Sequence, residues 1–369
     1  MHFICEKAIL VSAISIASRT VSSKNAIPAL EGIHIKAGTA LALTGYNLET
    51  GITVTTPARV EEAGACVLPA RLFFDIIRKL PDEPVSVQAD ERLQVSIRCG
   101  AVSFTIAGID ADSYPELPEV EFDNAVSLPQ RALKELIGGT IFSVSDNQAR
   151  PVHTGCLFEI ESEGLTVVAV DGYRLALRQF RCEEPIERSM RFVAPGAALK
   201  EVEKILSDSD DPVRITLGAK HILFEIGDAT LVCRVLEGEF LDWRRVLPQN
   251  NPIRLQGEVA KLTASVERVG LIVSEKIKSP VRCLFGNESA DFRTVTTIGA
   301  AHDVCALEGD GGDLEIGFNC RFLLEALQNI PEERTAIELS NGLSPIVFLP
   351  AGGGGRYAYM VLPVRLKEG

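Results

Sequence analysis

Three segments of the chain place apolar residues three or four positions apart, a pattern that predicts helices with one buried face. They are "PARLFFDIIRKLPDEP" (69–84), "APGAALKEVEKILSDSDDP" (194–212) and "FNCRFLLEALQNIPEER" (318–334). Each segment closes on an apolar residue followed by proline or serine, at Leu80, Leu206 and Ile330. Since these residues recur at steps of 126 and 124 positions, the pattern indicates an internal repeat.

Alternating apolar and polar residues follow each helix and predict strands, at 85–108, 213–236 and 336–350. A second amphipathic helix is predicted near the start of each third, at 5–23, 129–146 and 258–276. The joints near 122–126 and 249–256 are polar and rich in turn-forming residues. We therefore expect an α+β fold of three tandem copies, each with two helices plus antiparallel sheets, divided as 1–124, 125–251 and 252–369.

Composition indicates an ordinary globular protein, because 46% of residues are hydrophobic and 24% are charged. No stretch approaches the 18 uninterrupted apolar residues of a membrane span, and no basic region precedes the apolar part of the N-terminus. The nine cysteines form no CxxC pair and the five histidines are scattered, so we expect reduced thiols, no metal and no cofactor. These features predict a cytoplasmic protein without a membrane partner. The net charge of −13, taken alone, disfavours nucleic acid as a partner.

No catalytic constellation emerges. "GGGG" at 352–355 lacks the Lys-Ser/Thr of a phosphate loop and is interpreted as a hairpin tip. "SDSDDP" and "DADSYP" lack the full calcium-loop pattern, and no G-x-S-x-G elbow is present. We predict that the protein is not an enzyme. An unrecognised active site at a repeat junction remains a competing hypothesis.

Two stretches carry the residue types of binding hot spots. In "AVDGYRLALRQF" (169–180), Asp171-Gly172 predicts a turn between two strands that presents Tyr173, Arg174 and Leu175 together. "FLDWRRVLP" (240–248) similarly gathers Trp243, Arg244, Arg245 and Val246. Aromatic, arginine and leucine side chains dominate binding energy where they cluster, so both stretches are candidate partner sites.

The C-terminal run Tyr359–Leu366 is apolar and strand-like but contains Pro363. Proline has no N–H to give a neighbouring strand, so we expect an edge strand here rather than a central one. Val361, Leu362 and Val364 cannot all be buried in such a strand, because alternate side chains face opposite ways. This predicts that part of the run is exposed for a partner.

The motifs "DGYRLA", "F-x-DWRRVLP", "EIGFN" and the closing "Y-x-V-x-P-x-RL", with "IPALEGIHI" and "LPARLFFDIIRKLP" earlier, resemble those of the bacterial sliding clamp, the beta subunit of DNA polymerase III. The resemblance runs over the whole chain in order. It implies a head-to-tail homodimer whose six clamp-fold copies form a ring around duplex DNA. It also implies a processivity factor that tethers polymerase subunits, the clamp loader, and repair and translesion polymerases through short linear peptides.

The resemblance further implies three sets of residues. DNA, bound without sequence specificity, would be contacted by Lys24, Asn147 and Arg150. The dimer would be held by Phe104 against Leu271 and Ile272. The peptide groove would comprise Val170, Gly172, Tyr173, Arg174, Leu175, Leu241, Arg245, Val246, Asn319, Phe322, Leu343, Val361, Leu362, Pro363, Val364 and Arg365. Arg174 and Arg365 are expected to offer guanidinium donors to the peptide.

The chain departs from the family pattern in a few places. His153 stands where an apolar groove residue is common, Leu241 where proline is common, and Lys367–Gly369 extend past the usual end. Ala101 and Ser103 replace basic residues near the expected dimer contact. An alternative, favoured by the acidic net charge, is a repeat-built peptide-binding scaffold that does not encircle DNA.

Overall fold

The structure is a computed structural model that describes residues 1–22, 24–120, 125–182, 184–273 and 279–366. Part of the first predicted joint and the Lys367–Gly369 extension lie outside these ranges. Every predicted amphipathic helix is present: α1 Lys7–Ala17, α2 Ala70–Lys79, α3 Gln130–Gly138, α4 Gly196–Ile205, α6 Val259–Gly270 and α7 Cys320–Gln328. A further single-turn helix, α5 Trp243–Val246, was not predicted.

The chain divides into two compact units, and the middle third of the sequence contributes to both. The first unit comprises residues 1–134 with 197–235, and the second comprises 135–196 with 236–369. The repeat in the sequence is therefore not the unit of packing. The physical reason is that strands from neighbouring thirds pair with each other and build continuous sheets within each unit.

The first unit contains two antiparallel sheets, of order β5-β1-β7-β8-β9 and β10-β15-β16-β17-β4-β3-β2-β6. Ala229 of β17 pairs with Val54 of β4, which joins strands of the first and middle thirds. Helices α1 and α2 pack against each other, and α1 also contacts β3 and β4. The strands are β1 His2–Cys5, β2 Gly32–Ala37, β3 Leu41–Tyr46, β4 Thr50–Thr56, β5 Arg59–Glu62, β6 Gly64–Pro69, β7 Val85–Ala89, β8 Gln94–Cys99, β9 Val102–Ala107, β10 Ala125–Pro129, β15 Pro212–Leu217, β16 His221–Ile226 and β17 Ala229–Arg234.

The second unit is built on one antiparallel sheet of ten strands, in the order β14-β11-β12-β13-β23-β22-β21-β18-β20-β19. Arg174 of β13 pairs with Val361 of β23, which joins strands of the middle and last thirds. The strands are β11 Gly155–Glu161, β12 Gly164–Val170, β13 Arg174–Arg181, β14 Met190–Pro195, β18 Ile253–Glu258, β19 Val281–Thr296, β20 Gly299–Phe318, β21 Arg334–Leu339, β22 Ile346–Pro350 and β23 Tyr357–Val361. The short 3₁₀ helices η4 Ile141–Ser143 and η5 Pro151–Thr154 precede β11.

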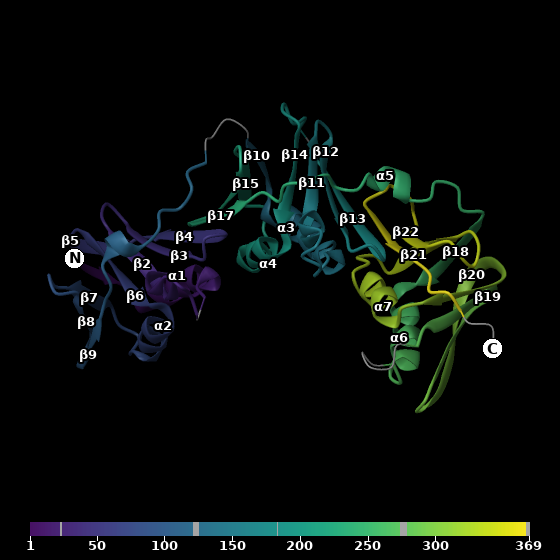
Figure 1. Cartoon of the computed structure of the whole chain (residues 1–369), viewed down its shortest axis with the longest axis horizontal. Coiled ribbons are helices and arrows are strands. Elements are labelled where there is room, and N and C mark those ends of the chain that lie inside the picture. Colours follow the sequence, from purple (N-terminus) through teal and green to yellow (C-terminus); the bar gives the residue numbers. More distant parts are fainter. Residues whose placement is uncertain (23, 121–124, 183, 274–278, 367–369) are drawn as a thin grey trace. The chain divides into compact units, whose positions relative to one another are not determined.

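Each face of this sheet carries its own apolar cluster, because side chains alternate along every strand. On one face, Tyr357, Tyr359 and Val361 of β23 pack with residues of α6 and α7. On the other face, Ala358 and Met360 pack with Trp243 and Val246 of α5 and with the loops around it. Figure 1 shows α7 and α5 on opposite sides of strands β13 and β22.

The expectation that the C-terminal run forms an edge strand is wrong. β23 lies between β13 and β22, with hydrogen-bonded neighbours on both sides. The chain leaves the sheet after Val361, two residues before Pro363, so the proline never has to donate to a ladder. The interpretation of "GGGG" as a hairpin tip is confirmed, since Gly353, Gly354 and Gly355 connect β22 to β23 with positive φ angles.

The cysteines are mostly buried thiols. All nine lie in the described part of the chain, where none forms a disulfide and only Cys182 is partly exposed. Burial raises the pKa of the Cys5 and Cys66 thiols to about 11 and that of Cys233 to about 12. Thiols held in the protonated form in this way are poor nucleophiles, which fits a packing role.

Candidate functional site

The predicted hot-spot residues of β13 are divided between the two faces of the sheet of the second unit. Leu175 packs in the cluster under α5, whereas Arg174 points to the face covered by α7. Residues Asp171–Tyr173 form the turn that joins the end of β12 to the start of β13. Gly172 adopts a φ angle of 92°, a conformation that favours glycine, so the predicted Asp-Gly turn is confirmed.

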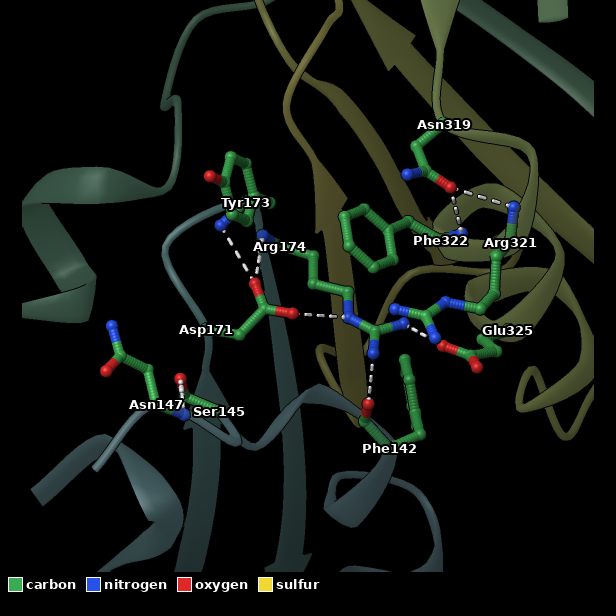
Figure 2. A network of polar contacts seen from close by, with 10 residues as sticks. All are labelled: Phe142, Ser145, Asn147, Asp171, Tyr173, Arg174, Asn319, Arg321, Phe322 and Glu325. Carbon is green, nitrogen blue, oxygen red and sulfur yellow. Dashed lines mark hydrogen bonds and ion pairs between the residues drawn. The ribbon is translucent and has the colours of Figure 1, made fainter. Parts of the chain in front are cut away.

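On the α7 face, Arg174 is the centre of a buried polar network (Figure 2). Its Nε donates to Asp171 Oδ2 at 3.0 Å, its Nη1 donates to Glu325 of α7, and its Nη2 donates to the carbonyl oxygen of Phe142 in η4. The side chain is only 7% exposed. Three of its five N–H groups thus donate within the chain, and the expected role of Arg174 as a donor to a partner peptide stays a prediction.

The ring of Phe322 lies at the centre of a stack on α7. The Arg174 guanidinium carbon lies 4.4 Å from its centroid, and that of Arg321 lies 5.2 Å away. Tyr173 stacks with the same ring at a centroid distance of 6.0 Å and an interplanar angle of 26°. Asn319 caps α7, because its Oδ1 accepts hydrogen bonds from the backbone N–H groups of Arg321 and Phe322. Tyr173, which is 64% exposed, thereby presents an aromatic surface to solvent beside the helix N-terminus.

The C-terminal segment runs beside this stack. The N–H of Leu362 donates to the carbonyl of Tyr173, and the N–H of Val364 donates to the carbonyl of Gly317, both at 2.8 Å. Pro363, which has no N–H, stands between these two donors. The side chains of Leu362 and Val364 are 37% and 39% exposed, whereas Val361 is fully buried. The prediction that part of the run stays accessible is confirmed.

On the α5 face, Val170 and Leu175 are almost completely buried under Phe240, Trp243 and Val246. Leu241 is 38% exposed next to them, and Arg245 extends into solvent, where its Nε lies 3.0 Å from Asp242 Oδ2. The ring of His153 in η5 meets that of Phe240 edge to face, at a centroid distance of 5.6 Å. Burial and the nearby charge of Arg150 lower the pKa of His153.

Trp243 and Arg244 both bond to the sheet beneath them, although the Arg244 side chain is 50% exposed. Both donate to Oε2 of Glu159 on β11, at 3.0 and 2.8 Å, and Arg244 stacks on the Trp243 ring. Sequence reasoning missed Glu159, as it missed Glu325 and the carbonyl of Phe142. An isolated glutamate in an alternating strand does not by itself indicate a buried site. Glu159 does share a strand face with the apolar Leu157, and a charged residue expected on a buried face needs a partner, which was the available signal.

The accessible residues around these two faces are called the partner surface below. It consists of Tyr173, Leu241, Arg245, Val246, Asn319, Arg321, Phe322, Leu362, Val364 and Arg365. Among the described residues, neither Arg321 nor Arg365 forms an ion pair within 4.0 Å, so both offer uncommitted positive charge. Leu343 is 75% exposed in a turn closed by Asn341.

The residues predicted to contact DNA lie in exposed loops. In the first unit, Lys24 follows α1, and its backbone N–H and carbonyl both bond to Ser22 Oγ. In the second unit, Asn147 organises the loop between η4 and η5, where its Oδ1 accepts from the N–H of Ala149 at 3.0 Å and its carbonyl accepts from the N–H of Arg150. Within the described ranges, Lys24 and Arg150 have no carboxylate partner within 4.0 Å, which leaves both charges available.

Two of the three residues predicted to form a dimer contact are exposed as well. Phe104 lies on β9, the edge strand of the five-stranded sheet, and is 41% exposed. Leu271 directly follows α6 and is 82% exposed, and Ile272 beside it is half-buried. An edge strand bearing an apolar side chain is a natural site for pairing with another chain.

Other kinds of site find little support. In the described part of the chain, no group of three His, Cys, Asp or Glu side chains is placed to hold a metal ion. None of the helices described is both long enough and apolar enough to cross a membrane.

Comparison with known proteins gives a consistent result along the whole chain. The family models for the N-terminal, central and C-terminal domains of the DNA polymerase III beta subunit match residues 1–118, 127–242 and 244–365. The chain is 32% identical to the beta sliding clamp of Staphylococcus epidermidis and 31% identical to that of Staphylococcus aureus, with 99% of each chain covered. Three matching domains in tandem confirm the fold class predicted from the repeat.

Solved structures agree with the sequence comparison. The fold matches that of a putative DNA polymerase III beta subunit from Eubacterium rectale with a TM-score of 0.95 at 33% identity, covering 99% of this chain and 100% of the other. It matches the DNA polymerase sliding clamp of Bacillus subtilis with a TM-score of 0.94 at 29% identity, covering all of both chains.

Proposed function

The chain belongs to the family of DNA polymerase III beta subunits, the bacterial sliding clamps, and from this premise we infer that it is a DNA polymerase processivity factor and not an enzyme. The observation that carries this inference is the match of three clamp domains in tandem over almost the full length. We propose the boundaries 1–124, 125–251 and 252–369 for the three copies.

Two copies of the chain close head to tail into a ring around duplex DNA in this proposal. Phe104 of one copy packs against Leu271 and Ile272 of the other, and the exposure of these apolar side chains in the single chain supports this pairing. A contact between two different surfaces, made twice, closes a two-fold ring without leaving free ends. Burial of an aromatic side chain at each contact would stabilise the ring by roughly 1.5–3 kcal/mol.

The net charge of −13 is compatible with a ring held on DNA by topology. Such a ring needs little affinity for phosphates, and strong contacts would slow its sliding. Lys24, Asn147 and Arg150 are proposed to make weak, non-specific contacts with the DNA backbone. Their exposure supports this, as does the absence of a carboxylate partner for Lys24 and Arg150 among the residues that the structure describes. Acidic side chains that lie much further than about 8 Å from the DNA repel it little, because about 8 Å is the Debye length at physiological salt.

The partner surface is proposed to bind short linear peptides of polymerases, the clamp loader and repair proteins. Its aromatic and aliphatic side chains suit a peptide with two apolar anchors, each contributing roughly 1.5–3 kcal/mol when buried. Arg321, Arg365 and Arg245 along its edge suit a carboxylate near those anchors. Val170, Leu175 and Val361 of the predicted groove are buried, so they support the exposed side chains by packing and do not contact the peptide themselves.

Primer extension tests the proposed function. DNA polymerase III core, clamp loader and ATP on a primed circular template should give long products only when this chain is added. Sedimentation of the free protein should give the mass of a dimer. Products of unchanged length, with peptide binding intact, would instead favour a peptide-binding scaffold that does not encircle DNA.

A further inference from the structure

Helix α5 is too short to hold its own position. It comprises only Trp243–Val246, and Asp242 at its N-terminus makes no side-chain capping bond. A single helical turn is not stable alone in water, since nucleation costs more than a few hydrogen bonds return. Irregular chain precedes it from Val235 and follows it to Pro252. Its position must therefore be fixed by contacts with the sheet beneath it.

The polar part of those contacts converges on one buried carboxylate, that of Glu159 on β11. Trp243 Nε1 and Arg244 Nη1 donate to its Oε2 at 3.0 and 2.8 Å. Arg191 of β14 donates from Nε to its Oε1 at 3.2 Å. Glu159 is 8% exposed as a residue and both of its oxygens have donors, whereas the side chains of Arg191 and Arg244 are 56% and 50% exposed. Bonds of this kind, between an ionised acceptor and good donors, are about twice as strong as neutral ones.

The apolar part of the contacts holds α5, which carries Arg245 and Val246 of the partner surface, on the sheet. Trp243 and Val246 pack on the cluster that contains Val170, Leu175 and Met360. Arg245, the residue between Arg244 and Val246, points away from the sheet with its side chain 87% exposed. The orientation of Arg245 and Val246 toward a partner is thus set by where Trp243 and Arg244 are held.

We propose that Glu159 is a positioning residue for partner binding: it holds α5 against the sheet so that Val246 and Arg245 present one wall of the peptide site. This inference rests on the proposed function of the partner surface and assigns it a residue that never touches the peptide. It also explains the composition of the "DWRRVLP" stretch. Trp243 and Arg244 serve as anchors to Glu159, and Arg245 and Val246 serve the partner.

The neighbouring Glu161 provides a matched control. It lies on the same strand and the same face, two residues further on, and its Oε1 is 3.9 Å from Arg244 Nη2. Its side chain is 68% exposed, so solvent screens this longer ion pair. Glu159→Gln and Glu161→Gln each remove one negative charge near Arg244, but only the first removes a charge from the buried anchor.

Trp243 is the only tryptophan in the chain, so its fluorescence reports the position of α5 directly. The test uses the full-length protein and a dye-labelled peptide chosen from a library of leucine- and phenylalanine-containing hexapeptides for binding to the unchanged protein. Loss of that binding in Val246→Ala shows that the peptide occupies the α5 wall. Fluorescence anisotropy gives its affinity, and Trp243 emission and acrylamide quenching report the exposure of the indole.

We expect Glu159→Gln to lower the affinity for the peptide about tenfold or more. A tenfold loss corresponds to roughly 1.4 kcal/mol of binding free energy. Trp243 emission should shift to the red and become easier to quench, whereas Glu161→Gln should leave affinity and emission unchanged. A truncated peptide without the anchor that contacts α5 should bind both variants equally, which a general loss of structure would not produce.

Unchanged peptide affinity in Glu159→Gln would overturn the proposal, and so would an equal loss in Glu161→Gln. If Glu159→Gln does not fold, Arg244→Gln removes the cation that bonds to Glu159. This variant should lower the affinity for the peptide and shift Trp243 emission in the same way. Normal affinity in Arg244→Gln would then contradict the inference. Failure of primer extension by the unchanged protein would count against the proposed function alone, because the fluorescence and peptide measurements need no DNA.

Discussion

The guanidinium of Arg174 lies over the ring of Phe322 at 4.4 Å and donates to Glu325, which stands on the same helix three residues further on. One side chain of β13 thereby fixes both a ring and a carboxylate of α7. Because β13 comes from the middle third of the sequence and α7 from the last, this contact joins two repeats within the second unit. The partner surface next to it depends on that junction.

Replacing Arg174 should therefore cost stability as well as partner binding. Arg174→Ala leaves Asp171, 12% exposed, and Glu325, 33% exposed, without their cation. Breaking a buried pair costs about 3–5 kcal/mol, and partial exposure of Glu325 lowers the expectation to about 2–4 kcal/mol in unfolding free energy. Denaturant titration measures the loss. The double variant Arg174→Ala with Glu325→Gln should lose less than the sum of the single changes, and strict additivity would contradict the pairing.

The C-terminal segment should separate binding from stability. Leu362→Ala with Arg365→Ala removes exposed side chains, so peptide affinity should fall below detection by calorimetry while the melting temperature changes little. Val361→Ala, one residue earlier, empties a fully buried position and should destabilise by about 1–3 kcal/mol. A collapsed melting temperature in the Leu362 and Arg365 variant would show that these side chains are structural first.

The proposed dimer contact makes a prediction about mass. Leu271→Ala with Ile272→Ala should give monomers in sedimentation at micromolar concentration, because the partner's aromatic anchor loses its apolar surface. Deleting such a contact typically costs about 3–5 kcal/mol. The free chain should still fold, since Leu271 is 82% exposed in it. Dimers that persist at low concentration would show that another surface forms the contact.

Protonation of His153 should weaken the fold in mild acid. Burial first, and then the charge of Arg150, lower its pKa in the folded state, so the unfolded chain binds the proton more readily. Stability should fall as the pH drops below about 6.5, the ordinary histidine value, and continue falling until the lowered pKa is passed. His34 and His221, whose pKa values are lowered as well, add to the same trend. His153→Phe should show a smaller drop in melting temperature between pH 7.5 and 5.5. An identical drop would contradict the assignment.

Contacts with DNA should be weak and sensitive to salt. Lys24→Gln and Arg150→Gln should each reduce the slope of log affinity against log salt by roughly 0.9, the value for one released counterion on duplex DNA. Binding to short duplexes of different sequence should weaken equally. Fluorescence anisotropy at several salt concentrations measures both. A variant with an unchanged slope would remove that residue from the proposed contact.

Periodicity in the sequence predicted the elements of the fold well. Helices such as α2 and α7 were identified because their buried stripes repeat with the helical period, and that stripe is a local property. The pairing of β17 with β4 and of β13 with β23 was not predicted, because pairing between distant strands leaves no mark on either strand alone. For the same reason the division into two units, which splits the middle repeat, could not be seen.

For the C-terminal run, the rule that proline cannot donate to a neighbouring strand is correct, but the edge strand predicted from it is wrong. Pro363 does exclude a central strand at its own position, but the strand ends at Val361 and the rule does not reach that far. That part of the run stays exposed was nevertheless predicted, and the structure shows that the exposed part includes Leu362 and Val364.

Arginine roles were the hardest part of the site to predict. Arg174, Arg244 and Arg245 all belong to motifs typical of binding surfaces, yet Arg174 is buried against Glu325, Arg244 bonds to Glu159 while half exposed, and Arg245 extends into solvent. Glu325 and Glu159 lie 151 and 85 positions away from these arginines along the chain. Only the folded structure brings these charges together.

Retention on DNA tests the central claim most directly. The unchanged protein is placed on nicked circular DNA by clamp loader and ATP, separated from free protein by gel filtration at high salt, and measured again after the circle is cut once. A ring held by topology predicts that the protein elutes with the circle and is lost after linearisation. Protein that stays bound to linear DNA, or that never remains on the circle although the loader is active, would contradict it.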